Sequence, residues 1–142
     1  MKFERQNCKP LENPSERMMA LSLKRMRSTG PSAFGTLSDD DGNYLQFGGG
    51  PTLFLLERCD GDMIFRASQE EPVVAFEDGT TYHFAGNAIA MLRGDWFLRK
   101  QVVQALGAFS RREPLPSFIS FRPAPGLFGE KIEPLWKRSH RD

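Results

Sequence analysis

The chain has 142 residues, 39% of them hydrophobic and 26% charged, and its net charge is +1. This length suits one domain whose core is large enough to fold without a disulfide framework or a structural metal. The small net charge argues against a dedicated nucleic-acid-binding domain, and no apolar run approaches the roughly 20 residues of a membrane span.

The first segments along the chain are expected to be an irregular arm and then a helix. Residues 1–12 show no regular pattern. Asn13 is the expected N-cap, Pro14 fits the first helical position, and Glu16 can complete a capping box. The apolar side chains that follow recur at helical spacing and predict one buried stripe: Met19, Leu23 and Met26. Gly30-Pro31 is expected to end the helix.

The next part of the chain, residues 32–93, has the texture of short antiparallel strands. Apolar and β-branched runs alternate with turn residues, among them Asp60-Gly61 and Asp78-Gly79, a residue pair that hairpin turns favour. Connections this short predict a meander and not parallel βαβ units. The expected strands are residues 33–37, 43–47, 52–58, 63–67, 73–76, 80–85 and 88–92.

A second helix is expected over residues 95–110, with Asp95 as its N-cap. Its apolar positions form a wide face: Leu98, Val102, Ala105, Leu106 and Phe109. A last strand is expected over residues 117–122, and residues 123–142 are expected to form an irregular tail. The predicted fold is α+β: a single domain over residues 1–142, built on one curved antiparallel sheet of about five to seven strands. The second helix packs on one face of that sheet, and the N-terminal helix lies beside it.

Residues that commonly carry chemistry lack the required spacing. His83 and His140 are the only histidines, and no motif places a nucleophile or further metal ligands beside either. The glycines at 48–50 precede Pro51 and an apolar strand, which indicates a bulge or tight connection and not a phosphate loop. The aspartates at 39–41 lack the ligand pattern of a calcium loop and indicate a solvated turn. We expect no catalytic residue, no metal and no cofactor.

The two cysteines, Cys8 and Cys59, have no partners at metal-ligand spacing and are too few for a disulfide framework. Free thiols are typical of a reducing compartment. The N-terminal residues carry charges but no apolar run behind them, so they do not match a secretory signal. We therefore expect a cytoplasmic protein that does not associate with membranes.

Charge is distributed unevenly along the chain. Residues 1–30 carry a net charge of +4, residues 31–93 a net of −7, and residues 94–142 a net of +4. One hypothesis is internal complementarity, with basic helices against an acidic sheet. The other is an acidic face that attracts a basic partner. The candidate acidic residues are Asp39, Asp40, Asp41, Glu57, Asp60, Asp62, Glu70, Glu71, Glu77 and Asp78.

The order of several short segments between residues 43 and 122 forms a further pattern. The segments are Tyr44-Leu45-Gln46, Gly48-Gly49-Gly50-Pro51-Thr52, Leu56-Glu57-Arg58, Phe65-Arg66-Ala67, Pro72-Val73-Val74, Phe76-Glu77-Asp78-Gly79-Thr80, Asp95-Trp96-Phe97 and Pro116-Ser117-Phe118-Ile119. This order resembles that of small bacterial immunity proteins of polymorphic toxin systems. The resemblance implies a non-enzymatic protein that binds and neutralises a cognate toxin, and it assigns no binding residues.

Glu70, Glu71, Glu77 and Asp78 flank one predicted strand pair and are the expected contact patch for a toxin or other basic protein. Two alternatives stay open. One is a small-ligand or regulatory domain with a pocket between sheet and helix, lined by phenylalanines and Trp96. The other is an enzyme of unfamiliar type, which a cluster of His83, Cys59 and a carboxylate in one cleft would support.

Overall fold

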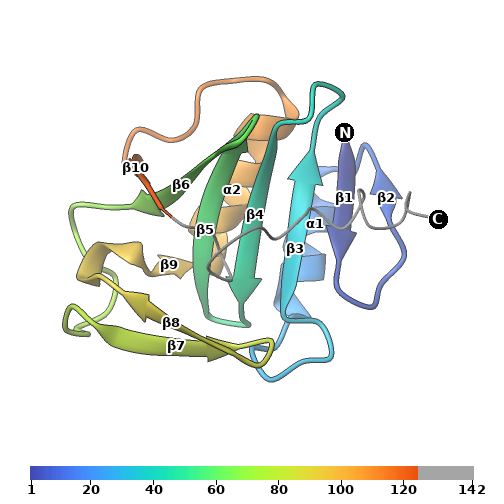
Figure 1. Cartoon of the computed structure of the whole chain (residues 1–142). Helices are drawn as coiled ribbons and strands as arrows, with labels where there is room; N and C mark the ends of the chain where they lie inside the picture. The colour runs from blue at the N-terminus through green and yellow to red at the C-terminus, as the bar shows by residue number, and fades with distance from the viewer. Residues whose placement is uncertain (125–142) are drawn as a thin grey trace.

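The computed structural model describes residues 1–124. An antiparallel sheet with two helices on one face lies at the centre of this part of the chain (Figure 1). The strands of this sheet follow the order β10-β6-β5-β4-β3-β1-β2, and β9 pairs with β5. The predicted α+β class with a mostly antiparallel sheet is confirmed. The strands are β1 (Lys2–Arg5), β2 (Leu11–Glu12), β3 (Phe34–Ser38), β4 (Tyr44–Gly49), β5 (Leu53–Asp60), β6 (Met63–Ser68), β7 (Thr80–Phe84), β8 (Asn87–Met91), β9 (Phe97–Leu98) and β10 (Ser120–Pro123). The helices are α1 (Glu16–Lys24) and α2 (Arg99–Ser110).

The predicted strand count and the predicted single sheet are both wrong. Within residues 1–124 the main sheet has eight strands, and β7 with β8 forms a separate two-stranded sheet. The main sheet is twisted but not strongly curled (Figure 1). Turn residues identify which neighbouring strands form hairpins, but they carry no information on whether a hairpin joins the main sheet. The hairpin instead lies across one end of the sheet, where its apolar face is covered (Figure 1).

The N-terminal arm, predicted to be irregular over residues 1–12, contains two strands. β1 pairs with β3 along its whole length, and β2 pairs with β1. Phe3 explains this arrangement, because its side chain is 2% exposed and stacks on the Phe47 ring with centroids 5.8 Å apart. A single buried aromatic in a four-residue strand gives no periodic signal, so the sequence pattern does not reveal this strand.

The N-cap of helix α1 lies two residues after the predicted N-cap, Asn13. Ser15 is the N-cap, and its Oγ accepts a hydrogen bond from Met18 N at 3.1 Å. Asn13 has a φ of 46°, and its Oδ1 accepts from the N-terminal ammonium at 2.6 Å. The predicted stripe is buried, but α1 packs beside α2 on the same face of the sheet and not beside the sheet.

Helix α2 begins at Arg99, four residues after the predicted start. Asp95 is therefore not its N-cap and instead ends a 3₁₀ turn over Arg93–Asp95. Leu98 occupies the N-cap position, and its N–H donates to Gln101 Oε1 at 3.0 Å. The short strand β9 intervenes because Phe97 is buried against β5.

Two apolar clusters fill the two faces of the sheet. The larger lies between the sheet and the helices, and Phe54 and Leu56 of β5 belong to it. Leu55, between them, points to the other face and packs with Phe84, Met91 and Trp96. Successive side chains of a strand point to opposite faces, and both faces of β5 are covered, which explains why β5 is apolar at four successive positions, 53–56.

The glycines at 48–50 allow the β7–β8 hairpin to pack closely on the sheet. A Cβ on Gly48 would overlap the Phe84 ring, and a Cβ on Gly49 would overlap the Tyr82 hydroxyl. Gly49 also has a φ of 112°, a backbone conformation that residues with a side chain rarely adopt. Tyr82 Oη donates to Leu53 O and accepts from Gly50 N at 3.1 Å. The triplet is thus a tight connection, as its sequence predicts.

Candidate functional site: an acidic loop beside two hollows

The four acidic residues predicted as a contact patch lie on one loop, residues 69–79, which joins β6 to β7 and is termed the acidic loop. Glu70, Glu71, Glu77 and Asp78 are all exposed. The predicted strand over residues 73–76 is absent, so these residues flank a loop segment and not a strand pair. All four nevertheless lie on this one loop of eleven residues.

Gln69 fixes the beginning of the acidic loop. Its backbone N–H donates to Gly94 O at 2.8 Å. Its side-chain Nε2 donates to Trp96 O at 2.9 Å and to Gln101 Oε1 at 3.1 Å, and its Oε1 accepts from Gln101 Nε2 at 3.0 Å. Gln69 is only 7% exposed, so these bonds satisfy a buried amide. The loop therefore leaves β6 in one defined direction.

The end of the acidic loop is held by Asp78 and its neighbours. Asp78 Oδ1 accepts from Arg93 N at 2.7 Å and lies 3.7 Å from Arg93 Nε. Gly79 N donates to Met91 O at 2.7 Å, and Thr80 Oγ1 donates to Glu77 O at 2.7 Å. Both ends of the loop are thus tied to the segment that carries β8 and the 3₁₀ turn.

The middle of the acidic loop is apolar and rests on the smaller core cluster. Val73 and Val74 are half-buried against that cluster. The Phe76 ring meets the Trp96 ring edge-to-face, with centroids 4.9 Å apart, and Phe76 remains 39% exposed. Three anchored regions in eleven residues make this loop a preorganised surface, with apolar side chains between pairs of carboxylates.

Two hollows flank the ridge formed by Pro72 and Val73, which line both. The first has a volume of about 650 Å³ and the second about 500 Å³. Residues lining the first are Gln69, Glu70, Glu71, Pro72, Val73, Gln101, Ser117, Phe118 and Ser120. Residues lining the second are Pro72, Val73, Val74, Ala75, Phe76, Glu77 and Arg93. Each hollow therefore combines an exposed aromatic ring with at least one of the predicted acidic residues.

A row of polar side chains, which the sequence pattern does not reveal, crosses the sheet on the face opposite the helices. Its members are directly opposed on neighbouring strands: Glu4, Thr36, Gln46, Glu57, Arg66 and Arg122. The first five are at most 5% exposed. Each has an apolar neighbour on at least one side in its strand, a pattern that also marks a strand with one solvated face. Only the pairing of six strands reveals the row.

Glu57 is the centre of this polar row. Its Oε1 accepts from Gln46 Nε2 at 2.8 Å, and its Oε2 accepts from Arg66 Nε at 2.8 Å. Burial raises the pKa of the Glu57 carboxyl, and the Arg66 guanidinium opposes that rise. A buried carboxylate between two donors is stabilised in one orientation, and losing either partner is costly.

The polar row continues to the turn beneath the acidic loop through Asp95. Asp95 Oδ2 lies 3.8 Å from Arg66 Nη1, accepts from Leu92 N at 3.0 Å, and also accepts from Arg122 Nη2. Because Gly94 O receives the Gln69 N–H, the turn that Asp95 stabilises is also the support of the acidic loop. The row thus contributes to the geometry of the loop.

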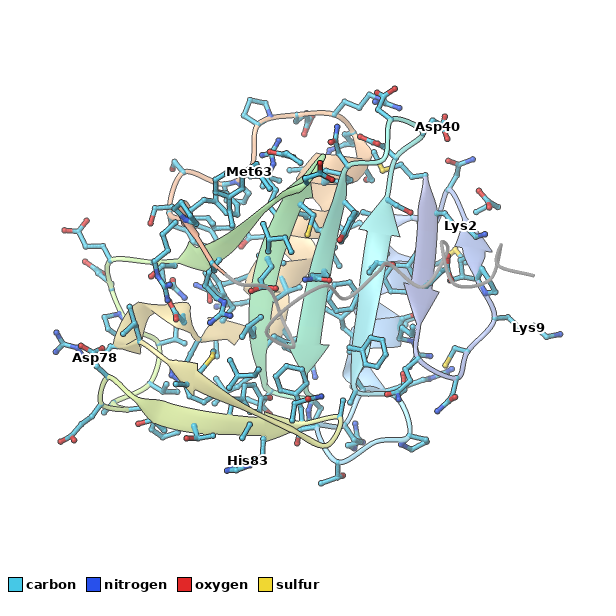
Figure 2. The ribbon with its side chains drawn as sticks, viewed as in Figure 1. Lys2, Lys9, Asp40, Met63, Asp78 and His83 are labelled. Atoms are coloured by element: carbon cyan, nitrogen blue, oxygen red, sulfur yellow. The ribbon has the colours of Figure 1, made fainter. Side chains whose placement is uncertain are left out.

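The residues considered for catalysis differ in burial and do not point into one cleft. His83 is exposed and points away from the sheet (Figure 2). Cys59 is buried on β5, where burial raises the pKa of its thiol to about 12, and Cys8 is exposed. Asp39 Oδ1 accepts from Asp41 N and Asn43 N, an ordinary turn. Within residues 1–124 no three His, Cys, Asp or Glu side chains group as a metal site.

The charges of the acidic loop are not compensated by the basic helices. Asp78 pairs with Arg93, and within the described residues Glu70, Glu71 and Glu77 make no ion pair. Figure 2 shows Asp78 at the opposite end of the sheet from Lys2 and Lys9. Of the two hypotheses for the uneven charge, internal complementarity with the basic helices does not extend to Glu70, Glu71 and Glu77 within the described residues.

No protein-family model and no curated protein matches this chain. Neither helix in the part of the chain that the structure describes has the length and apolar character needed to cross a membrane.

Proposed function

We propose that this protein is a non-enzymatic binding protein of the bacterial cytoplasm that neutralises a cognate toxin by direct contact through the acidic loop. The observation that carries the proposal is the anchoring of this loop at Gln69, at Phe76 and at Asp78. A loop held in one conformation loses little conformational entropy on binding. An immunity protein needs such a surface on a stable scaffold, and it needs no reactive centre.

The composition of the acidic loop supports a basic protein as the partner. Exposed apolar residues such as Phe76 and Phe118 are the kind that dominate the centre of protein interfaces. Glu70 and Glu71 line the same hollow as Phe118, and Glu77 lines the same hollow as Phe76. None of these three carboxylates has an ion-pair partner within residues 1–124. Negative charge at the rim speeds encounter with a positively charged partner such as a nuclease.

A rescue assay tests the proposal. The product of the neighbouring gene is expressed in a naive bacterium with and without this protein, and survival is scored. We expect the neighbour alone to kill and coexpression to protect. A harmless neighbour, or one that kills equally in both strains, would contradict the immunity function.

A second candidate function is small-ligand binding, and the hollow of about 650 Å³ favours it. This volume lies within the range of ligand sites, roughly 300–1,000 Å³, and the hollow lies between the acidic loop and Gln101 of α2. Trp96, predicted to line such a pocket, is instead packed between Phe76 and Tyr82. Thermal stabilisation by a metabolite, lost in a Phe118→Trp variant that fills the hollow, would support this candidate over toxin binding.

A further inference from the structure

A basic groove lies between the two helices, at the start of α2, on a part of the surface that the proposed function does not use. Its volume is about 410 Å³. The lining residues are Ala20 of α1, Pro51 and Thr52 before β5, Leu98, and Arg99, Lys100 and Val103 of α2. Apolar side chains form most of this lining, and two cations stand at its rim. None of the described residues that line it is acidic.

Two more cations on α1 extend the positive rim. Arg17 and Lys24 stand three residues before and four residues after Ala20, which places them on the same side of the helix. Both are exposed, as is Leu21 between them, which is 50% exposed. Within residues 1–124 no ion pair involves Arg17, Lys24, Arg99 or Lys100, so their positive field is uncompensated.

The acidic loop is complementary to this basic groove in both charge and apolar character. The Phe76 ring, which contacts Trp96, leaves 39% of its surface exposed, and Glu77 follows it directly. The exposed part of this ring, placed against the apolar lining of the groove, would bring the adjacent carboxylate to the cations at the rim. The loop belongs to the β6–β7 connection and the groove to the two helices, so a second copy can offer the loop that the first copy's groove accepts.

We propose that the basic groove binds the acidic loop of a second copy of this chain. Two different surfaces meet in this contact and every copy carries both, so the association grows with concentration. Its exposed ion pairs weaken as salt screens them. The occupied loop is unavailable to any other basic partner, so partner binding and self-association compete for the same carboxylates.

Sedimentation velocity of the protein alone tests this proposal over a concentration series from micromolar to millimolar at low salt. The first variant reverses the charge of three cations at the groove: Arg17→Glu, Lys24→Glu and Lys100→Glu. The second variant reverses the charge of three carboxylates of the acidic loop: Glu70→Lys, Glu71→Lys and Glu77→Lys. Asp78 and Arg99 are kept, because Asp78 binds Arg93 N and Arg99 Nη1 donates to Pro51 O at 3.1 Å. A control for the groove variant reverses three cations outside the groove: Lys9→Glu, Arg25→Glu and Arg112→Glu.

We expect the average mass of the wild type to rise with concentration and to fall to that of the monomer when salt is added. The groove variant and the loop variant should each stay monomeric, their equimolar mixture should associate again, and the control variant should behave as the wild type. A wild type that is monomeric throughout the series would overturn the proposal. Association that persists unchanged in the groove variant would also overturn it. Neither outcome depends on a toxin, so failure of self-association is separable from failure of the rescue assay.

Discussion

The side-chain amides of Gln69 and Gln101 are paired in both directions, with Nε2–Oε1 distances of 3.1 and 3.0 Å. One residue begins the acidic loop and the other lies in the first turn of α2. Gln101 Oε1 also accepts from Leu98 N, so the same oxygen fixes the helix start and the loop. The Gln101 amide therefore contributes both to the start of α2 and to the first of the three anchors of the acidic loop.

Replacing Gln101 should loosen the acidic loop. Gln101→Ala removes the partner of a buried amide and the bond to Leu98 N, which should lower the free energy of unfolding by about 1–3 kcal/mol. Hydrogen exchange in residues 70–76 should accelerate more than in β4. Gln104→Ala, at an exposed position of the same helix, is the matched control and should leave both quantities near the wild-type values. Equal exchange in the two variants would contradict the anchoring role.

Gly94 should tolerate no side chain, because its Cβ would overlap Gln69 O and lie 2.7 Å from Ser68 Oγ. Gly94→Ala should therefore break the bond from Gln69 N to Gly94 O and displace the beginning of the acidic loop. Chemical denaturation should show a loss of stability, and the amide resonances of residues 69–72 should shift. Gly61→Asn, in an open turn with a φ of 61°, controls for substitution of a glycine as such. Unshifted loop resonances in the alanine variant would contradict the packing.

Most strands were predictable because turn chemistry and alternation are local signals. The expected segments at 63–67 and 80–85 agree with β6 and β7 to within a residue. The predicted strand at 73–76 was wrong because Val73 and Val74 pack onto the smaller apolar cluster from a loop and do not pair with a neighbouring strand. β-Branched residues serve either purpose, and the sequence does not distinguish them.

The acidic residues of the candidate site were predictable from the sequence, but the hydrogen bonds that hold their loop in place were not. Glu70 and Glu71 stand out in the sequence as charges beside a proline. The bonds that fix them join Gln69 to residues 25 to 32 positions away, and such contacts leave no periodic pattern. The cross-strand row from Glu4 to Arg122 was hidden for the same reason, since it exists only once the strands are paired.

Glu57 should make stability depend on pH in the direction opposite to that of a typical ion-paired carboxylate. Its folded pKa lies above the ordinary value of 4.5 because burial disfavours the charged form. Between pH 4.5 and the folded pKa, the folded state holds a proton that the unfolded state has lost. The contribution of Glu57 to stability should therefore fall as pH rises through that interval and stay constant above it.

The comparison of Glu57→Gln with the wild type measures this dependence. We expect the unfolding free energy of the wild type, minus that of the variant, to decrease as pH rises from 4.5. Glu12→Gln, at an exposed position, serves as the reference substitution. A difference that increases with pH would mean that the attraction of Arg66 outweighs burial, which would contradict a raised pKa for Glu57 in the folded protein.

The two cysteines should differ sharply in reactivity. The Cys59 thiol is buried and its pKa is raised to about 12, so almost none of it is thiolate at neutral pH. A thiol reagent should modify one cysteine of the native protein, and Cys8→Ser should abolish that reaction. Denaturant should expose one thiol in the Cys8→Ser variant. Rapid labelling of native Cys8→Ser would contradict the burial of Cys59.

The most direct test of the central claim is the affinity of the cognate toxin for a loop variant, measured by calorimetry. Glu70→Lys, Glu71→Lys and Glu77→Lys reverse three charges of the acidic loop, and Asp40→Lys, Asp41→Lys and Asp62→Lys make the same net change elsewhere. Losing three rim ion pairs and replacing them by repulsion should weaken binding by about tenfold or more. We predict that loss for the loop variant alone. Equal affinities for the two variants would contradict the acidic loop as the binding surface.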